Sequence, residues 1–103
     1  FSKEALKFVV PFCRNENLKI FGRMPLAKGI LSGKYNEVSN FKKKDPRFKD
    51  KKITLKILKF VKNKNVNTKT SIQWALNHSD KIIIGFKNLN QIENISEIIK
   101  KYE

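Results

Sequence analysis

The sequence has little that could cross-link the chain or bind a metal ion. Cys13 is its single cysteine, so no disulfide can form within the chain. Cys13 lies on an apolar helical stripe, which predicts a small buried side chain rather than a reactive thiol. One cysteine and one histidine, His78, lie far apart and give no cluster of ligands, so we expect no metal site.

Long apolar runs are also lacking. No run approaches the ~20 residues that a membrane-spanning helix needs, and no signal peptide precedes a cleavage site. We therefore expect no membrane partner and a cytoplasmic location, which a single cysteine also suits. The chain begins with Phe1 rather than methionine, so we expect it to be a piece of a longer protein.

Acidic residues are few, and the excess of basic residues raises the question of nucleic-acid binding. The chain contains nine Asp and Glu residues and 23 Lys and Arg residues, which gives a net charge of +14. Of the 23 cations, 20 are lysines spread along the chain, whereas base and phosphate recognition favours the planar guanidinium of arginine. We therefore expect no nucleic-acid partner, and a positive potential that helps to attract a phosphate-rich cofactor.

Apolar residues recur at helical spacing in four places. The first stripe, which runs from Ala5 to Cys13, contains Pro11, and this proline should kink or restart the helix. A second stripe contains Ile53, Ile57, Leu58 and Val61, and a third contains Ile72, Ala75 and Leu76. A fourth helix is predicted to open at Asn88 and to turn five side chains inward: Leu89, Ile92, Ile95, Ile99 and Tyr102.

Two short apolar segments, near 18–23 and 81–85, are predicted to be buried strands, and the second is predicted to be buried on both sides. Strands separated by helices indicate a parallel sheet with right-handed crossovers, and thus an α/β fold. Between Met24 and Asp50 no periodicity is sustained, which predicts a long functional loop. Since two strands cannot close a sheet, we expect residues 1–103 to be one partial domain that is marginal or insoluble alone.

Five motifs give the chain a resemblance to a known family. Residues 25–35, PLAKGILSGKY, closely resemble the aldo-keto reductase segment P-L-A-x-G-x-L-[TS]-G-K-[YF]. Four more follow the order of that family: PFCR at 11–14, DPRF at 45–48, WALN at 74–77, and IGFK at 84–87 with Gln91-Ile92. The resemblance covers nearly the whole chain but only the last third of a family member.

The resemblance implies a C-terminal fragment of a (β/α)₈ TIM barrel that contains its seventh and eighth strands. In such barrels the loops after these strands frequently build a phosphate site. The residues themselves agree with a phosphate site. Gly29 and Gly33 allow the backbone to approach a ligand closely. Asn88 and Gln91 are predicted to form a capping pair at a helix start, where N–H groups can bind an anion.

By resemblance, the parent protein is an oxidoreductase that uses NADPH to reduce an aldehyde or ketone. Its catalytic Asp, Tyr, Lys and His come from earlier strands, in a missing N-terminal part, so we expect no catalytic residue in this chain. The charge of Lys87 favours NADP over NAD. The residues that the resemblance assigns to the cofactor are Arg23, Met24, Pro25, Leu26, Ala27, Gly29, Leu31, Gly85, Phe86, Lys87, Asn88, Gln91 and Asn94.

Three positions depart from the family pattern. Arg23 stands where many members have an aromatic residue that stacks on the nicotinamide, and Ile84 replaces the usual proline. Asn94 and Ile95 occupy the positions of a Glu-Asn pair whose Asn contacts adenine, so this contact is either shifted or lost. Two other readings stay open: a non-catalytic binding module like the potassium-channel β subunits, and a basic polyanion-binding protein.

Overall fold

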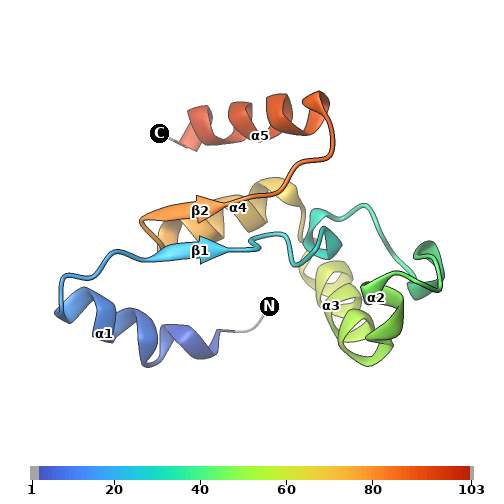
Figure 1. Cartoon of the computed structure of the whole chain (residues 1–103), viewed down its shortest axis with the longest axis horizontal. Coiled ribbons are helices and arrows are strands. Elements are labelled where there is room, and N and C mark those ends of the chain that lie inside the picture. Colours follow the sequence, from blue (N-terminus) through green and yellow to red (C-terminus); the bar gives the residue numbers. More distant parts are fainter. Residues whose placement is uncertain (1–2, 103) are drawn as a thin grey trace. The chain divides into compact units, whose positions relative to one another are not determined.

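The computed structural model describes residues 3–102, which form two compact units (Figure 1). One unit runs to Pro25 and resumes at Ile72, and the other is Leu26–Ser71. The α-helices are α1 (Val9–Asn15), α2 (Pro46–Lys49), α3 (Lys51–Lys64), α4 (Thr68–His78) and α5 (Leu89–Tyr102). The strands are β1 (Phe21–Arg23) and β2 (Lys81–Ile83), and the 3₁₀ turns are η1 (Glu4–Leu6), η2 (Ile30–Ser32) and η3 (Val38–Asn40).

In the first unit, β1 and β2 pair in parallel, as the sequence predicts (Figure 1). Both strands are shorter than the predicted segments and contain three residues each. The prediction that the first strand is buried, and the second buried on both sides, is wrong, because the side chains of Phe21 and Ile83 are each 55% exposed. The reason is that β2 has only β1 beside it, and no further layer of described residues covers the face that carries Ile83.

The predicted N-terminal helix is divided into a short 3₁₀ turn and a separate α-helix that contains the proline. η1 ends at Leu6, and α1 begins at Val9, so Pro11 falls in the first turn, where its missing N–H removes no intrahelical bond. The chain then reverses through Asn17, whose φ of 54° is left-handed. Cys13 is half-buried rather than fully buried, because the described chain places few apolar groups against this helix.

Asp80 joins three elements of the first unit. Its Oδ2 accepts a hydrogen bond of 2.7 Å from the backbone N–H of Ile20, and its Oδ1 lies 2.8 Å from Nη1 of Arg14. These two bonds lower the pKa of Asp80, the backbone bond from Ile20 more than the bond from Arg14. The carboxylate thereby links the end of α1 to the starts of both strands.

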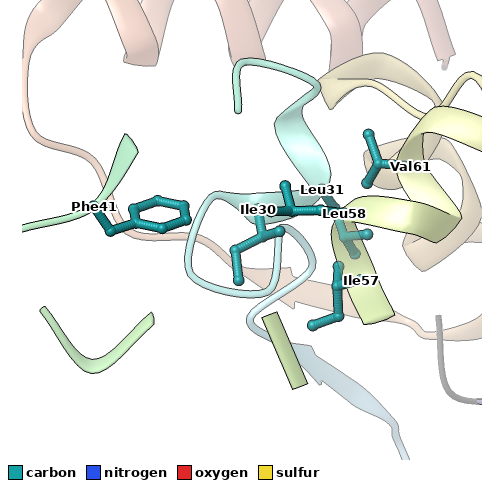
Figure 2. Close-up of a cluster of buried hydrophobic side chains, with 6 residues drawn as sticks. All are labelled: Ile30, Leu31, Phe41, Ile57, Leu58 and Val61. Carbon is teal, nitrogen blue, oxygen red and sulfur yellow. The ribbon is translucent and has the colours of Figure 1, made fainter. Parts of the chain in front are cut away.

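The second unit has its own hydrophobic core, which Figure 2 shows. It consists of six buried side chains: Ile30, Leu31, Phe41, Ile57, Leu58 and Val61. Three of the four residues of the predicted stripe of α3 are buried, but Ile53 is 57% exposed. Thr54, which is 2% exposed, is buried instead of Ile53. The hydroxyl of Thr54 donates a 2.6 Å hydrogen bond to the carbonyl oxygen of Arg47.

The segment between Met24 and Asp50 is less irregular than predicted, since it contains η2, η3 and α2. Helix α2 follows from local chemistry: Asp45 caps it by accepting a 2.8 Å bond from the N–H of Arg47, and Pro46 occupies its first turn. The predicted long loop is therefore a chain of short turns that pack on α3.

The last two helices agree with their predicted positions. In α4, Ile72 and Ala75 are buried as predicted. In α5, Ile95 is buried and Ile99 is half-buried. The inward prediction is wrong for three exposed residues: Leu89 (74%), Ile92 (41%) and Tyr102 (38%). Within residues 3–102, no helix combines the length and the apolar character that crossing a bilayer requires.

Candidate functional site

The two strands end at the same edge of their sheet. Arg23 pairs with Ile83, and these are the last residues of β1 and β2. Because the pairing is parallel, the segments that follow, Met24-Pro25 and residues 84–87, leave from one edge (Figure 1). The carboxyl edge of a parallel sheet is where ligands bind in α/β proteins. Two of the predicted cofactor segments therefore start side by side.

The start of α5 is held by a pair of hydrogen bonds. The side-chain oxygen Oδ1 of Asn88 accepts a 3.0 Å bond from the N–H of Gln91. Oε1 of Gln91 accepts a 2.8 Å bond from the N–H of Lys87, rather than from that of Asn88. The predicted capping pair is thus confirmed with its return bond shifted by one residue, which fixes the backbone just before the helix.

The groups around this helix start are open to solvent. A Cβ added to Gly85 would meet no heavy atom within 4 Å, and Phe86 is 43% exposed. Lys87 and Asn88 are exposed, and among the described residues the ammonium group of Lys87 forms no ion pair. The N–H groups of the first helical turn have no intrahelical acceptor, and they carry the positive end of the helix dipole. This corner can therefore bind an anion.

The end of β1 adds a second cation to the same edge. Arg23 is exposed, and its Nη2 lies 3.4 Å from Sδ of Met24. The backbone of Met24 has a φ of 54°, a left-handed conformation that non-glycine residues rarely adopt. Pro25 follows and is half-buried. The backbone thus leaves the extended conformation directly after β1, at the point where the predicted phosphate loop begins.

In the second unit, the predicted loop forms a left-handed turn. Ala27, Lys28 and Gly29 have φ values of 45°, 58° and 85° in succession. Each non-glycine residue in this conformation costs about 1–2 kcal/mol, so the turn needs support from its surroundings. Part of the support is local: the N–H of Leu31 donates to the carbonyl oxygen of Leu26 at 3.1 Å.

Gly29 and Gly33 play different roles. Gly29 would have room for a Cβ, with the nearest atom of Arg47 at 3.7 Å, but its φ favours glycine. Gly33 has a φ of 80° and no such room, because a Cβ would lie 3.0 Å from the carbonyl oxygen of Val66. Gly33 is therefore required for packing within the second unit.

Arg47 connects the turn to the rest of the second unit. Its Nη1 donates a 3.0 Å bond to the carbonyl oxygen of Lys28. Its Nε and Nη2 donate to the two carboxylate oxygens of Asp45 at 3.0 and 2.7 Å. The guanidinium carbon also lies 4.3 Å from the ring centre of Phe41 and 5.2 Å from that of Tyr35. The hydrogen bond to Asp45 raises the pKa of Arg47 above its usual value, more than burial lowers it.

Sequence reasoning did not assign a role to Arg47. The signal was present in the motif DPRF at 45–48, which was identified only as a family loop. Its contact with Lys28 spans 19 residues of sequence, and no local pattern reports a bond of that range.

The predicted site residues fall into two groups. The first unit contains nine of them: Arg23, Met24, Pro25, Gly85, Phe86, Lys87, Asn88, Gln91 and Asn94. Four belong to the second unit: Leu26, Ala27, Gly29 and Leu31. Leu31 is 9% exposed in the core, and its carbonyl oxygen accepts a bond from Ser71. Burial therefore removes its side chain from the set that can face a ligand.

Three other polar residues are engaged in packing. The ring of His78 stacks on Trp74, and its Nδ1 lies 2.7 Å from the carbonyl oxygen of that residue. The hydroxyl of Tyr102 is hydrogen-bonded to Asn77, and Tyr35 packs on Phe41. No group of three or more potential metal ligands occurs within residues 3–102.

Comparison with known proteins gives one finding. The model of the aldo/keto reductase family matches residues 3–102. The searches of the curated proteins and of the solved structures returned no significant match. Because the family match extends over almost every residue, and the motifs of the loop and of the helix start lie within it, this chain belongs to the aldo/keto reductase family of oxidoreductases, which generally use NAD(P)H.

Proposed function

We propose that this chain is the C-terminal third of an NADP-dependent aldo-keto reductase and supplies its cofactor-binding loops. The observation that carries the proposal is the register of β1 and β2, which sends both predicted loops from one sheet edge. In a (β/α)₈ barrel these strands are the seventh and eighth, and the loops after them bind phosphate groups. In this proposal, the preceding part of the barrel is the partner that packs against the exposed sheet. The protein is proposed to be cytoplasmic.

The residues present fit a phosphate-rich dinucleotide. Lys87 and the open helix start beside it suit the 2′-phosphate of NADP, and Gly85 leaves space for it. The segment from Met24 to Gly29 would wrap the pyrophosphate. Asn94 is exposed on α5 and is proposed as a weaker contact to the adenine side.

The bound cofactor supplies a hydride for an aldehyde or ketone carbonyl. This chain binds and orients the dinucleotide, and the proton comes from a tyrosine in the preceding part of the barrel. Arg23 lies at the strand end, where its guanidinium plane can stack on the nicotinamide ring. Gln91 acts indirectly, since its side chain holds the backbone of Lys87.

The test is the variant Lys87→Met in the complete protein. Loss of one charge-assisted hydrogen bond should raise KM for NADPH about tenfold or more, because such a bond contributes roughly 1.5–3 kcal/mol. KM for NADH should change little, since NADH lacks the 2′-phosphate. Lys81→Met is the matched control, because Lys81 is an exposed lysine at the opposite end of β2.

Equal changes of KM for both dinucleotides would contradict the assignment of Lys87. Binding of NADPH without turnover of any carbonyl compound, in a protein that lacks the catalytic tyrosine and lysine, would instead indicate a non-catalytic binding module.

A further inference from the structure

We propose that Arg47 is a positioning residue that holds the left-handed turn of Ala27, Lys28 and Gly29 in its ligand-ready form. This inference rests on the proposed function, because the turn is part of the proposed cofactor loop. Arg47 itself does not reach the cofactor in this proposal. It acts through the carbonyl oxygen of Lys28.

The left-handed turn requires external support. Three successive residues have φ values between 45° and 85°, and two of them carry side chains. Outliers of this kind persist only where the surrounding structure determines them, and they concentrate at ligand sites. The bond from Nη1 of Arg47 to the carbonyl oxygen of Lys28, at 3.0 Å, holds the turn at its middle residue.

Arg47 is itself held in place. Its side chain is 14% exposed, and its Nε and Nη2 are used by the carboxylate of Asp45. The ring of Phe41, a core residue, lies beneath the guanidinium. On the backbone side, the buried hydroxyl of Thr54 donates to the carbonyl oxygen of Arg47. The turn is therefore tied through Arg47 to the core on α3.

Most of the hydrogen-bonding capacity of Arg47 is used within the second unit. Its Nε and one N–H each of Nη1 and Nη2 donate to Asp45 and Lys28, and the side chain is only 14% exposed. We therefore assign its effect on binding to the shape of the turn. That shape serves the pyrophosphate, which NADPH and NADH share. Loss of Arg47 should thus weaken both dinucleotides equally, in contrast to the selective effect predicted for Lys87.

The experiment compares Arg47→Met with Arg14→Met in the complete protein. Dissociation constants for NADPH and NADH are measured by titration of cofactor fluorescence, together with kcat and the melting temperature. Arg47→Met should weaken both dinucleotides about tenfold with kcat nearly unchanged at saturation. Arg14→Met breaks a 2.8 Å bridge to Asp80, at the start of β2 in the first unit, so both dissociation constants should stay within about twofold.

A second variant keeps the test decisive if Arg47→Met does not fold. Arg47→Lys retains the charge, but an ammonium group cannot bond both oxygens of Asp45 and the carbonyl of Lys28 in the same fork geometry. It should therefore fold and still weaken both dinucleotides. Wild-type affinity in Arg47→Lys would overturn the proposal, as would losses in Arg47→Met no larger than those in Arg14→Met. If the wild-type protein binds neither dinucleotide, the proposed function fails, and this inference fails with it.

Discussion

Gly22, in the middle of β1, offers a sharp test of the packing in the first unit. A Cβ added there would lie 2.8 Å from Oγ of Ser79, closer than side chains tolerate. Ser79 cannot move away at no cost, because it is buried and its hydroxyl donates a 2.6 Å bond to the carbonyl oxygen of Ala75. Ala75 lies in the last turn of α4, so this bond ties Ser79 to the end of that helix.

The loss of stability in Gly22→Ala can be estimated, because the contact between the added Cβ and Ser79 can be relieved in two ways. Breaking the bond from Ser79 to Ala75 leaves the buried hydroxyl of Ser79 unpaired, at about 1–3 kcal/mol. Moving β1 away from Ser79 instead disturbs the packing around the strand, at a similar cost of about 1–3 kcal/mol. We therefore expect Gly22→Ala to lower the free energy of unfolding of the complete protein by about 1–3 kcal/mol.

Urea unfolding, followed by circular dichroism, measures this loss in a double-mutant cycle with Ser79→Ala. Ser79→Ala alone should cost about 0.5–1.5 kcal/mol, the net value of one hydrogen bond. In the double variant the clash disappears, because the Cβ atom of Ser79 lies at an ordinary 3.4 Å. The two changes should thus be less than additive by about 1 kcal/mol.

Gly85→Ala is the matched control for stability. A Cβ at Gly85 meets nothing within 4 Å, so the change should be neutral or stabilise by about 0.4–1 kcal/mol through the unfolded state. Additive losses in the cycle, or equal losses for Gly22→Ala and Gly85→Ala, would refute the proposed clash with Ser79.

Two further predictions concern charge and core packing. The pKa of Asp80 is lowered from its usual 3.8, so its stabilisation is full above that pH and disappears as the pH falls through the folded value. Asp80→Asn should therefore lower the melting temperature at neutral pH, with a difference from wild type that shrinks in acid; a difference independent of pH would contradict the ionic role. In α3, Leu58→Ala should cost about 2–5 kcal/mol in urea unfolding, because Leu58 is 5% exposed. Leu55→Ala, at a residue 55% exposed on the same helix, should cost much less, and equal losses would show that the core of the second unit is placed wrongly.

Local sequence patterns were sufficient for the helices and for the direction of the strands. Helices α3, α4 and α5 follow from apolar spacing and from caps such as Asn88 with Gln91, which depend on residues close in sequence. The order of strands and helices predicted a parallel pair, and the motifs at 25–35 and 84–87 predicted the family. The helix stripes and caps join residues near each other along the chain, whereas the parallel pairing of two distant strands follows from the rule for strands separated by helices.

Other features were decided by tertiary contacts between residues far apart in sequence. Thr54 rather than Ile53 faces the core, because successive helical residues are 100° apart and the centre of the buried stripe passes through Thr54, which bonds to Arg47. The tie from Arg47 to Lys28 and the close approach of Gly22 to Ser79 join residues that no local pattern relates. The sequence by itself therefore determined the elements, their parallel order and the family, since these follow from short-range patterns and from the order of elements along the chain. Which side chains support the left-handed turn was decided only when the chain folded, since such bonds depend on distances in space.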